Sequence, residues 1–336
     1  MTFFSIGDLA SAFQLRQLSG QMKADMTRLV KEVSTGQKQD LRSSISGDFG
    51  PLAAIERSLT VLKSYSSANA ELESFLSAAQ TSLEDIQGLG RDISPGLLQA
   101  ADTGEASLID TLSTDAQQKL SAATSRLNLR FGGRSVFAGA ASDSQALVDG
   151  KTLLQSIKAA VAGETTVEGF IQAVDDWFDT PGGGFESDAY LGSTDNLGPF
   201  PIGDGETLSM EARADDPAIR EFLKGLTLAS LAADASLPGN PSAGKEIASA
   251  AATRLMAADG MMTQMRADLG VQQARLDEAT TKNGSQAEAF ELAKSELISA
   301  DPYETATELQ AVRSRLETLY AATARIADLS FTDFMR

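Results

Sequence analysis

Residues 255–297 read LMAADGMMTQMRADLGVQQARLDEATTKNGSQAEAFELAKSEL, and this stretch decides the fold. Alternating gaps of three and four residues run through it without a break. Side chains at this spacing lie on one stripe of an α-helix, and such a stripe needs a partner helix at every turn. In order, the stripe consists of Leu255, Ala258, Met262, Met265, Leu269, Gln272, Leu276, Ala279, Asn283, Gln286, Phe290, Ala293 and Leu297.

Stripes of the same kind occur in the first half of the chain. One begins at Leu52 and resumes at Leu72, and another lies within residues 105–131. Because the chain supplies its own partner helices, we expect pairing within one chain; a coiled coil between copies is the alternative. Gln272, Asn283 and Gln286 either fix the register of the seam or mark where the helix leaves its partners. The predicted fold class is mainly α, an elongated antiparallel helical bundle or coiled coil with a small mixed α/β insert.

Proline and glycine divide the chain into segments. Six of the nine prolines lie between residues 181 and 241, whereas 242–300 contains none. We predict an N-terminal helix in 1–45, a helical rod formed by 46–139 and 242–300, an inserted mixed lobe at 140–241, and a C-terminal helix in 301–336. Within the rod, the helix that starts at residue 51 is expected to weaken at Gly88–Gly90 and to break at Pro95-Gly96.

The predicted insert contains short elements of both kinds. Helices are expected at 151–161, 166–178 and 217–231, and strands at 189–191, 200–202 and 207–212. The turn Gly203-Asp204-Gly205 is expected to join the last two strands.

Composition excludes several functions. The chain of 336 residues has 28 basic and 46 acidic residues, a net charge of −18, which disfavours nucleic acid and acidic membranes as partners. It contains no histidine and no cysteine, so histidine bases, cysteine nucleophiles, disulfides and zinc sites built from these residues are excluded. We therefore predict no enzyme activity, no catalytic residues, no cofactor and no metal. The stretch before Arg16 lacks the features of a secretory signal.

Four passages carry a family resemblance. They are EVSTGQK (32–38), FGGRSVFAG (131–139), DPYETATEL (301–309) and LETLYAATARIADLSFTDFMR (316–336). In this order they resemble passages of the flagellin superfamily, and within it of the hook–filament junction proteins (hook-associated protein 3). The resemblance covers 5–140 and 242–336. It departs at 42–51, where the family's usual SDDP motif is replaced.

This resemblance implies a structural protein of the bacterial flagellum. Such a protein is exported unfolded through the flagellar type III apparatus, is assembled at the growing tip, and is extracellular, at the hook–filament junction. The implied partners are another hook-associated protein, flagellin, an export chaperone and copies of the chain itself in a ring. Flagellin, the filament subunit, is the alternative within the family. A non-flagellar coiled-coil adaptor is the alternative from another class, and an enzyme is the least supported reading.

The two chain ends carry the predicted assembly interface. Each has a short apolar stripe, and short isolated helices are marginally stable in water. The stripes either dock on the helical body or order when copies assemble, and the resemblance favours the second. The predicted interface pairs one set of residues from each end: Leu309, Val312, Leu316, Leu319 and Ile326 against Leu15, Leu18, Met22 and Leu29.

Overall fold

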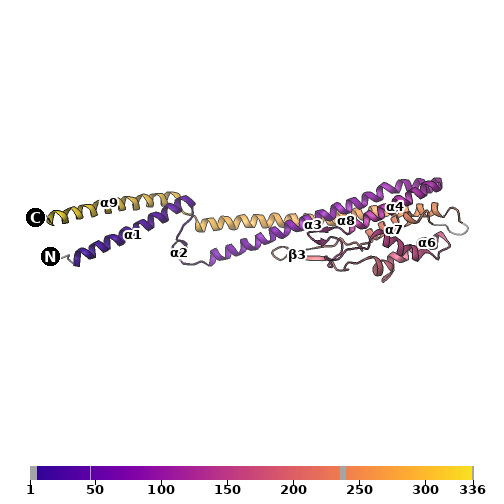
Figure 1. The fold of residues 1–336 in the computed structure, drawn as a ribbon, viewed down its shortest axis with the longest axis horizontal. Coiled ribbons are helices and arrows are strands. Elements are labelled where there is room, and N and C mark those ends of the chain that lie inside the picture. The colour runs from indigo at the N-terminus through magenta and orange to yellow at the C-terminus, as the bar shows by residue number, and fades with distance from the viewer. Residues whose placement is uncertain (1–5, 46, 235–239, 335–336) are drawn as a thin grey trace. The chain divides into compact units, whose positions relative to one another are not determined.

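The structure is a computed structural model that describes residues 6–45, 47–234 and 240–334 (Figure 1). Its contacts form two units: a terminal unit, residues 1–63 and 285–336, and a central unit, residues 64–284. In chain order the elements are α1 (Ile6–Thr35), α2 (Leu41–Ser44), α3 (Gly50–Thr103), α4 (Ala106–Leu127), β1 (Arg130–Phe131), β2 (Arg134–Ser135), α5 (Gly150–Val161), α6 (Val167–Asp179), the π-helical turn η1 (Phe185–Ala189), β3 (Leu197–Gly203), β4 (Glu206–Met210), α7 (Pro217–Leu231), α8 (Ala243–Ile298) and α9 (Pro302–Phe334). The predicted mainly α fold with a small mixed insert is confirmed.

Helices α3 and α8 run antiparallel through the central unit. Two cross-helix ion pairs fix the direction: Glu84 meets Arg266 at 3.1 Å, and Arg91 meets Asp259 at 2.5 Å. Residue numbers therefore rise along α3 as they fall along α8. The predicted stripe faces this seam, because its positions from Leu255 to Asn283 are all buried except the half-buried Gln272. In the central unit the stripe is thus covered by its own chain.

The predicted break in α3 is wrong. The helix continues from Gly50 to Thr103 through both Gly88–Gly90 and Pro95. Proline inside a helix costs about 3 kcal/mol because it removes an N–H donor and crowds the preceding turn. Packing offsets that cost here, since Ile93 and Leu97 are almost completely buried against the neighbouring helices. A local propensity was overridden by tertiary contacts.

Two glycines allow helices of the central unit to approach closely. A Cβ atom on Gly90 of α3 would lie 2.8 Å from the ring of Phe222 in α7. A Cβ atom on Gly225 of α7 would lie 2.7 Å from the side chain of Leu255 in α8. Both distances are shorter than carbon–carbon contact permits, so any larger residue would force these helices apart.

The insert largely follows the prediction. Helices α5, α6 and α7 are present, and β3 pairs with β4 as an antiparallel hairpin whose turn contains Asp204 and Gly205. The predicted strand at 189–191 is wrong: residues 185–189 form a π-helical turn, and Tyr190 makes a single bridge to Leu147. A second hairpin, β1–β2, was not predicted; Gly132 and Gly133, both with positive φ, form its turn.

The insert does not separate from the helices at the predicted bounds of 140 and 241. Helix α7, which lies inside those bounds, packs on α4, where the Ser113 hydroxyl donates to the Ala229 carbonyl at 2.9 Å. It also contacts α8, where Arg254 pairs with Glu221. One continuous hydrophobic core includes side chains from the insert and from α3, α4 and α8. Helix α7 is therefore part of the central bundle, because its buried face supplies contacts that the other helices lack.

The β3–β4 hairpin is attached to the helical seam by two buried amides. The Nδ2 atoms of Asn69 in α3 and Asn283 in α8 both donate to the Ile202 carbonyl, at 3.0 and 2.7 Å. Asn69 also donates to the Thr280 hydroxyl at 3.2 Å. Both asparagines are buried, so this polar cluster would be costly to leave unbonded. Asn283 thus sits under the hairpin, which explains one polar position of the predicted stripe.

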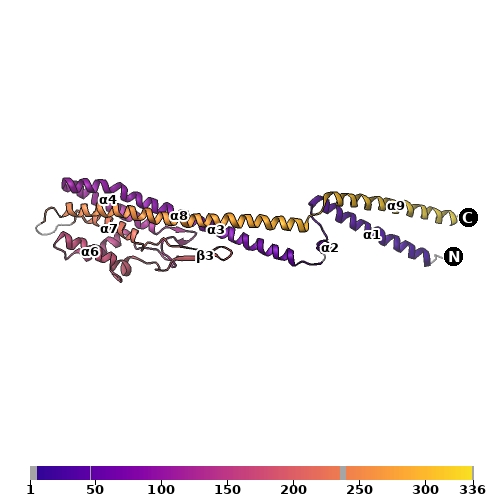
Figure 2. The same cartoon turned by 180° about the vertical axis from the view of Figure 1, so that it is seen from behind.

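In the terminal unit, α1 and α9 lie side by side (Figures 1 and 2). The first turns of α3 and the last turns of α8 belong to the same unit, where Lys294 pairs with Glu56 at 3.2 Å. The short helix α2 lies in the connection between α1 and α3. This unit contains both predicted assembly stripes.

Candidate assembly surface on the terminal helices

The predicted interface residues lie on α1 and α9, and these two helices pack against each other. Leu29 is 1% exposed, the most buried of the apolar side chains described in α1. Leu18 is exposed. Ile326 lies within α9, but its side chain falls outside what the structure describes. The remaining predicted residues are half-buried: Leu15, Met22, Leu309, Val312, Leu316 and Leu319.

Local sequence signals position the two helices. Helix α1 ends at Thr35, and Gly36 follows with φ of 68°, a left-handed conformation that glycine adopts without strain. Helix α9 begins after Asp301, whose Oδ1 accepts hydrogen bonds from the backbone N–H groups of Tyr303 and Glu304 at 2.8 and 3.0 Å. Such a cap satisfies donors that the first helical turn would otherwise leave free.

The connections that lead out of α1 and into α9 are bonded to each other. The Lys38 N–H donates to the Ile298 carbonyl at 2.8 Å, and the Ala300 N–H donates to the Gly36 carbonyl at 2.9 Å. Beside this bridge, the buried Glu32 carboxylate accepts a hydrogen bond from the Gln39 N–H at 2.9 Å. These bonds hold the end of α1 and the start of α9 at the same level.

The helix pair leaves several large apolar side chains in water. Phe13 is 69% exposed and Tyr303 is 84% exposed. Val30 and Val33, on α1, are also close to half exposed. Scattered apolar side chains are common on any protein surface. Here they accompany a seam whose own members are mostly half-buried, so α1 and α9 together bury little of their apolar area.

A shallow groove of about 870 Å³ runs between the two helices. Its apolar wall contains Met26, Val30, Ala306 and Leu309, and its polar rim contains Gln310, Arg313, Ser314 and Glu317. Helices pack by inserting the side chains of one into grooves of another. The groove is therefore suited to receiving side chains of a further helix.

Farther along the pair, a cation–π contact joins the two helices. The Lys23 ammonium of α1 lies over the Tyr320 ring of α9, 5.8 Å from its centroid. Hydrogen bonding with Lys23, and then with Ser19, lowers the pKa of the Tyr320 phenol. Both groups are at the surface, so this contact orients the two helices more than it stabilises them.

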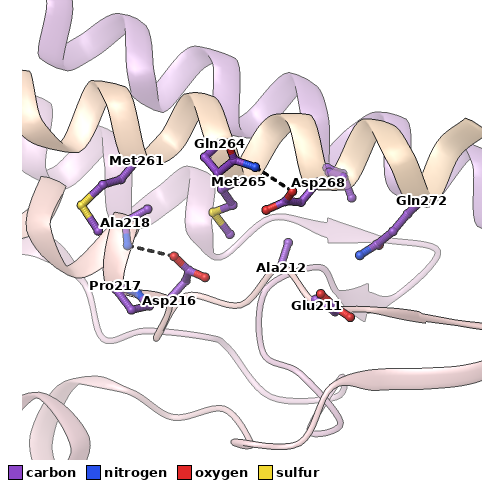
Figure 3. A pocket seen from close by; sticks show the side chains of 11 residues that line it. Glu211, Ala212, Asp216, Pro217, Ala218, Met261, Gln264, Met265, Asp268 and Gln272 are labelled. Atoms are coloured by element: carbon purple, nitrogen blue, oxygen red, sulfur yellow. Dashed lines mark hydrogen bonds between the residues drawn. The ribbon is translucent and has the colours of Figure 1, made fainter.

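The central unit contains a pocket with carboxylate side chains in its lining (Figure 3). It has a volume of about 330 Å³ and lies between α8 and the segment leading into α7. The Asp216 carboxylate accepts a hydrogen bond from the Ala218 N–H at 2.8 Å, and Asp268 accepts one from the Gln264 amide at 2.9 Å. Burial raises the pKa of Asp216. Asp216 thus caps the start of α7, and Asp268 is a hydrogen-bond partner of Gln264 within α8. The residues that line the pocket include no serine, threonine or lysine that could act as a nucleophile beside them.

Among the residues that the structure describes, no three or more acidic, histidine or cysteine side chains are grouped so that they could hold a metal ion. No described helix is both long enough and apolar enough to cross a membrane.

Sequence reasoning missed part of the candidate surface. Phe13, Val30 and Tyr303 lie off the three-four stripe, so periodicity gave no reason to select them. The bridge between the two connections pairs backbone groups far apart in sequence, which no side-chain pattern signals. An apolar residue on a face that is otherwise polar was the available signal for Phe13 and Val30.

Comparison with known proteins gives one family match. Residues 254–335 match the bacterial flagellin C-terminal helical region. No curated protein matches the chain. Among solved structures, one from Vibrio parahaemolyticus, provisionally described as a flagellar hook-associated protein, aligns with a TM-score of 0.48 and 16% identity over 73% of this chain and 95% of that chain.

The matched residues include most of α8 and all of α9, and therefore one side of the candidate surface. The predicted structural, non-enzymatic role in the bacterial flagellum is in keeping with this match, which covers residues 254–335. Residues 254–335 are similar to the C-terminal helical region of the bacterial flagellins, and the predicted resemblance to the flagellin superfamily is confirmed over these residues.

Proposed function

We propose that this protein joins the hook to the filament of the bacterial flagellum, and that copies of it assemble through α1 and α9. The observation that carries this proposal is the terminal helix pair, which is similar to a flagellin C-terminus on its α9 side and leaves apolar side chains such as Phe13 and Val30 uncovered. Packing against copies and against neighbouring flagellar proteins would remove this area from water. Leu29 is already buried within the terminal unit, and the other predicted interface residues remain our candidates for those contacts.

The proposal includes the route and the partners. The chain would leave the cell unfolded through the flagellar type III apparatus, escorted by an export chaperone. At the tip it would form a ring, with another hook-associated protein and flagellin as neighbours. The passage FGGRSVFAG at 131–139 favours a junction protein over flagellin itself. In the structure this passage forms the β1–β2 turn and the buried segment Val136–Ala138.

Gene disruption tests the proposal. Cells without this protein should make hooks, lack filaments in electron micrographs, and release flagellin into the medium. The full chain should restore filaments. Filaments of normal length in the disrupted strain would refute the proposal, and long filaments formed by the purified protein alone would identify it as the filament subunit.

A matched pair of substitutions tests the interface. Val312 is half-buried on the predicted stripe of α9, whereas its neighbour Ala311 is exposed. Val312→Asp should abolish restoration of filaments because it places a charge in the apolar seam. Ala311→Asp adds the same charge on an exposed face and should restore them. Equal behaviour of the two variants would contradict the assignment of the stripe.

A further inference from the structure

The net charge is distributed very unevenly between the two units. The central unit, 64–284, holds 15 basic and 31 acidic residues, a net charge of −16. The terminal unit, 1–63 and 285–336, holds 13 basic and 15 acidic residues, a net charge of −2. The terminal unit, whose helix pair leaves Phe13, Val30 and Tyr303 exposed, is therefore almost neutral, and the central unit is strongly acidic.

Most basic side chains of the central unit form ion pairs within the same unit. Ten of its basic residues form ion pairs with its own carboxylates, namely Arg91, Lys119, Arg126, Lys158, Arg213, Arg220, Lys224, Arg254, Arg266 and Lys282. The acidic excess consequently lies on the solvent side. Four exposed members of it lie near one level of the antiparallel α3–α8 pair: Glu71, Glu73, Asp277 and Glu278.

Copies that pack through their terminal units bring their central units into the same neighbourhood. Residues 63 and 64 are consecutive within α3, and residues 284 and 285 are consecutive within α8. Each packed end thus carries an attached charge of −16. Like charges repel over roughly 30 Å at 0.01 M salt but over only about 3 Å at 1 M.

We propose that the negative charge of the central unit opposes self-association through the nearly neutral terminal unit. We call this repulsion the electrostatic brake. Apolar contacts between terminal units attract, and the charge on the central units opposes them. The balance holds the free chain apart at low ionic strength, where repulsion reaches far. This inference rests on the proposed assembly through α1 and α9, and it adds a control on when that assembly occurs.

The test measures self-association of the full chain by analytical ultracentrifugation. Replacing the four exposed acids by their amides (Glu71→Gln, Glu73→Gln, Asp277→Asn, Glu278→Gln) changes the charge of the central unit from −16 to −12. Repulsion scales with the product of the two charges, so it falls to roughly half. At about 0.01 M salt, we expect the association constant of this variant to rise about tenfold or more.

A charge-conserving variant provides the control. Glu71→Asp, Glu73→Asp, Asp277→Glu and Glu278→Asp alter the same four sites and keep the charge, so this variant should associate like the parent chain. At about 1 M salt all three proteins should associate equally, because the repulsion is screened. Comparison at one low salt concentration separates the brake from any direct effect of salt on apolar contacts.

The outcomes distinguish the two proposals. If the chain associates equally at low and high salt, and the amide variant behaves like its parent, the brake is wrong and assembly through the ends stands. If no variant associates at any salt concentration, packing of copies through α1 and α9 is itself contradicted, and the brake falls with it.

Discussion

Two glycines on α3 should respond in opposite ways to the same substitution. Gly88 and Gly90 lie two residues apart within one continuous helix. A Cβ atom on Gly88 would have no neighbour within 4 Å, whereas a Cβ atom on Gly90 would lie 2.8 Å from the Phe222 ring. Alanine is favoured over glycine in a helix by about 1 kcal/mol at either site. The two sites thus differ mainly in the space available for one methyl group.

The expected magnitudes follow from that difference. Gly88→Ala should stabilise the protein by about 1 kcal/mol, which corresponds to roughly 2–4 °C in Tm for a unit of this size. At Gly90 the ring of Phe222 is almost completely buried and has no free side to move into. Overpacking of this kind costs about 1–3 kcal/mol, so after the helix gain Gly90→Ala should destabilise by about 1 kcal/mol.

Trp177 reports on this region directly. It is the single tryptophan of the chain and lies in α6 of the central unit, so its fluorescence follows unfolding of that unit in urea. Adding Phe222→Leu to Gly90→Ala should recover part of the loss, because the shorter side chain frees the space. Stabilisation by both alanine substitutions, to a similar extent, would refute the close approach of α3 and α7.

Three further outcomes are expected. Asn283→Ala should destabilise the central unit by about 1–2 kcal/mol, because it removes the buried amide that donates to Ile202; the exposed Lys282→Ala is its control, and an equal loss in both would contradict the role of the buried amide. Burial raises the pKa of Asp216, so the contribution of this carboxyl group to the free energy of unfolding is present below its unfolded pKa and is lost as pH rises through its folded pKa. Asp216→Asn should flatten that part of the pH–stability profile. An unchanged profile would show that the group is not desolvated. Deleting 140–241 should abolish cooperative unfolding seen by circular dichroism, because α7 is lost from the core, and a deletion protein that still unfolds cooperatively would restore the predicted separate lobe.

The helices of the central unit could be predicted from the sequence because each buries a periodic stripe. Leu255 to Asn283 is the clearest case, since every three-four position but Gln272 is buried. The failures have a common cause. Pro95 and Gly90 both argue for a break when α3 is considered alone, and both are explained by contacts with helices elsewhere in the chain. A glycine within a helix either lowers the stability of that helix or lets a neighbouring helix approach closely, and the sequence does not distinguish the two.

Contacts of the insert cross its predicted bounds for a related reason. Composition changes sharply near residue 140, and proline and glycine mark both ends of the insert. These signals locate changes in local chain conformation, whereas the core is defined by contacts. Helix α7 has an apolar, mostly buried sequence that fits equally well in a separate lobe or in a bundle. In the structure α7 packs on α4 and α8, so it belongs to the bundle.

The terminal helices show what a stripe alone leaves open. The sequence allowed the α1 stripe to dock on the body of the same chain or to order among copies, and it paired the residues of this stripe with those of the C-terminal stripe; in the structure α1 packs against α9. That pairing satisfies each helix only in part, because the seam residues are mostly half-buried and Phe13 and Val30 remain exposed. A helix pair that buried its apolar area completely would have little to gain from copies. One that is nearly neutral and incompletely covered gains both contact area and order on assembly, and this combination is what assembly from the chain ends requires.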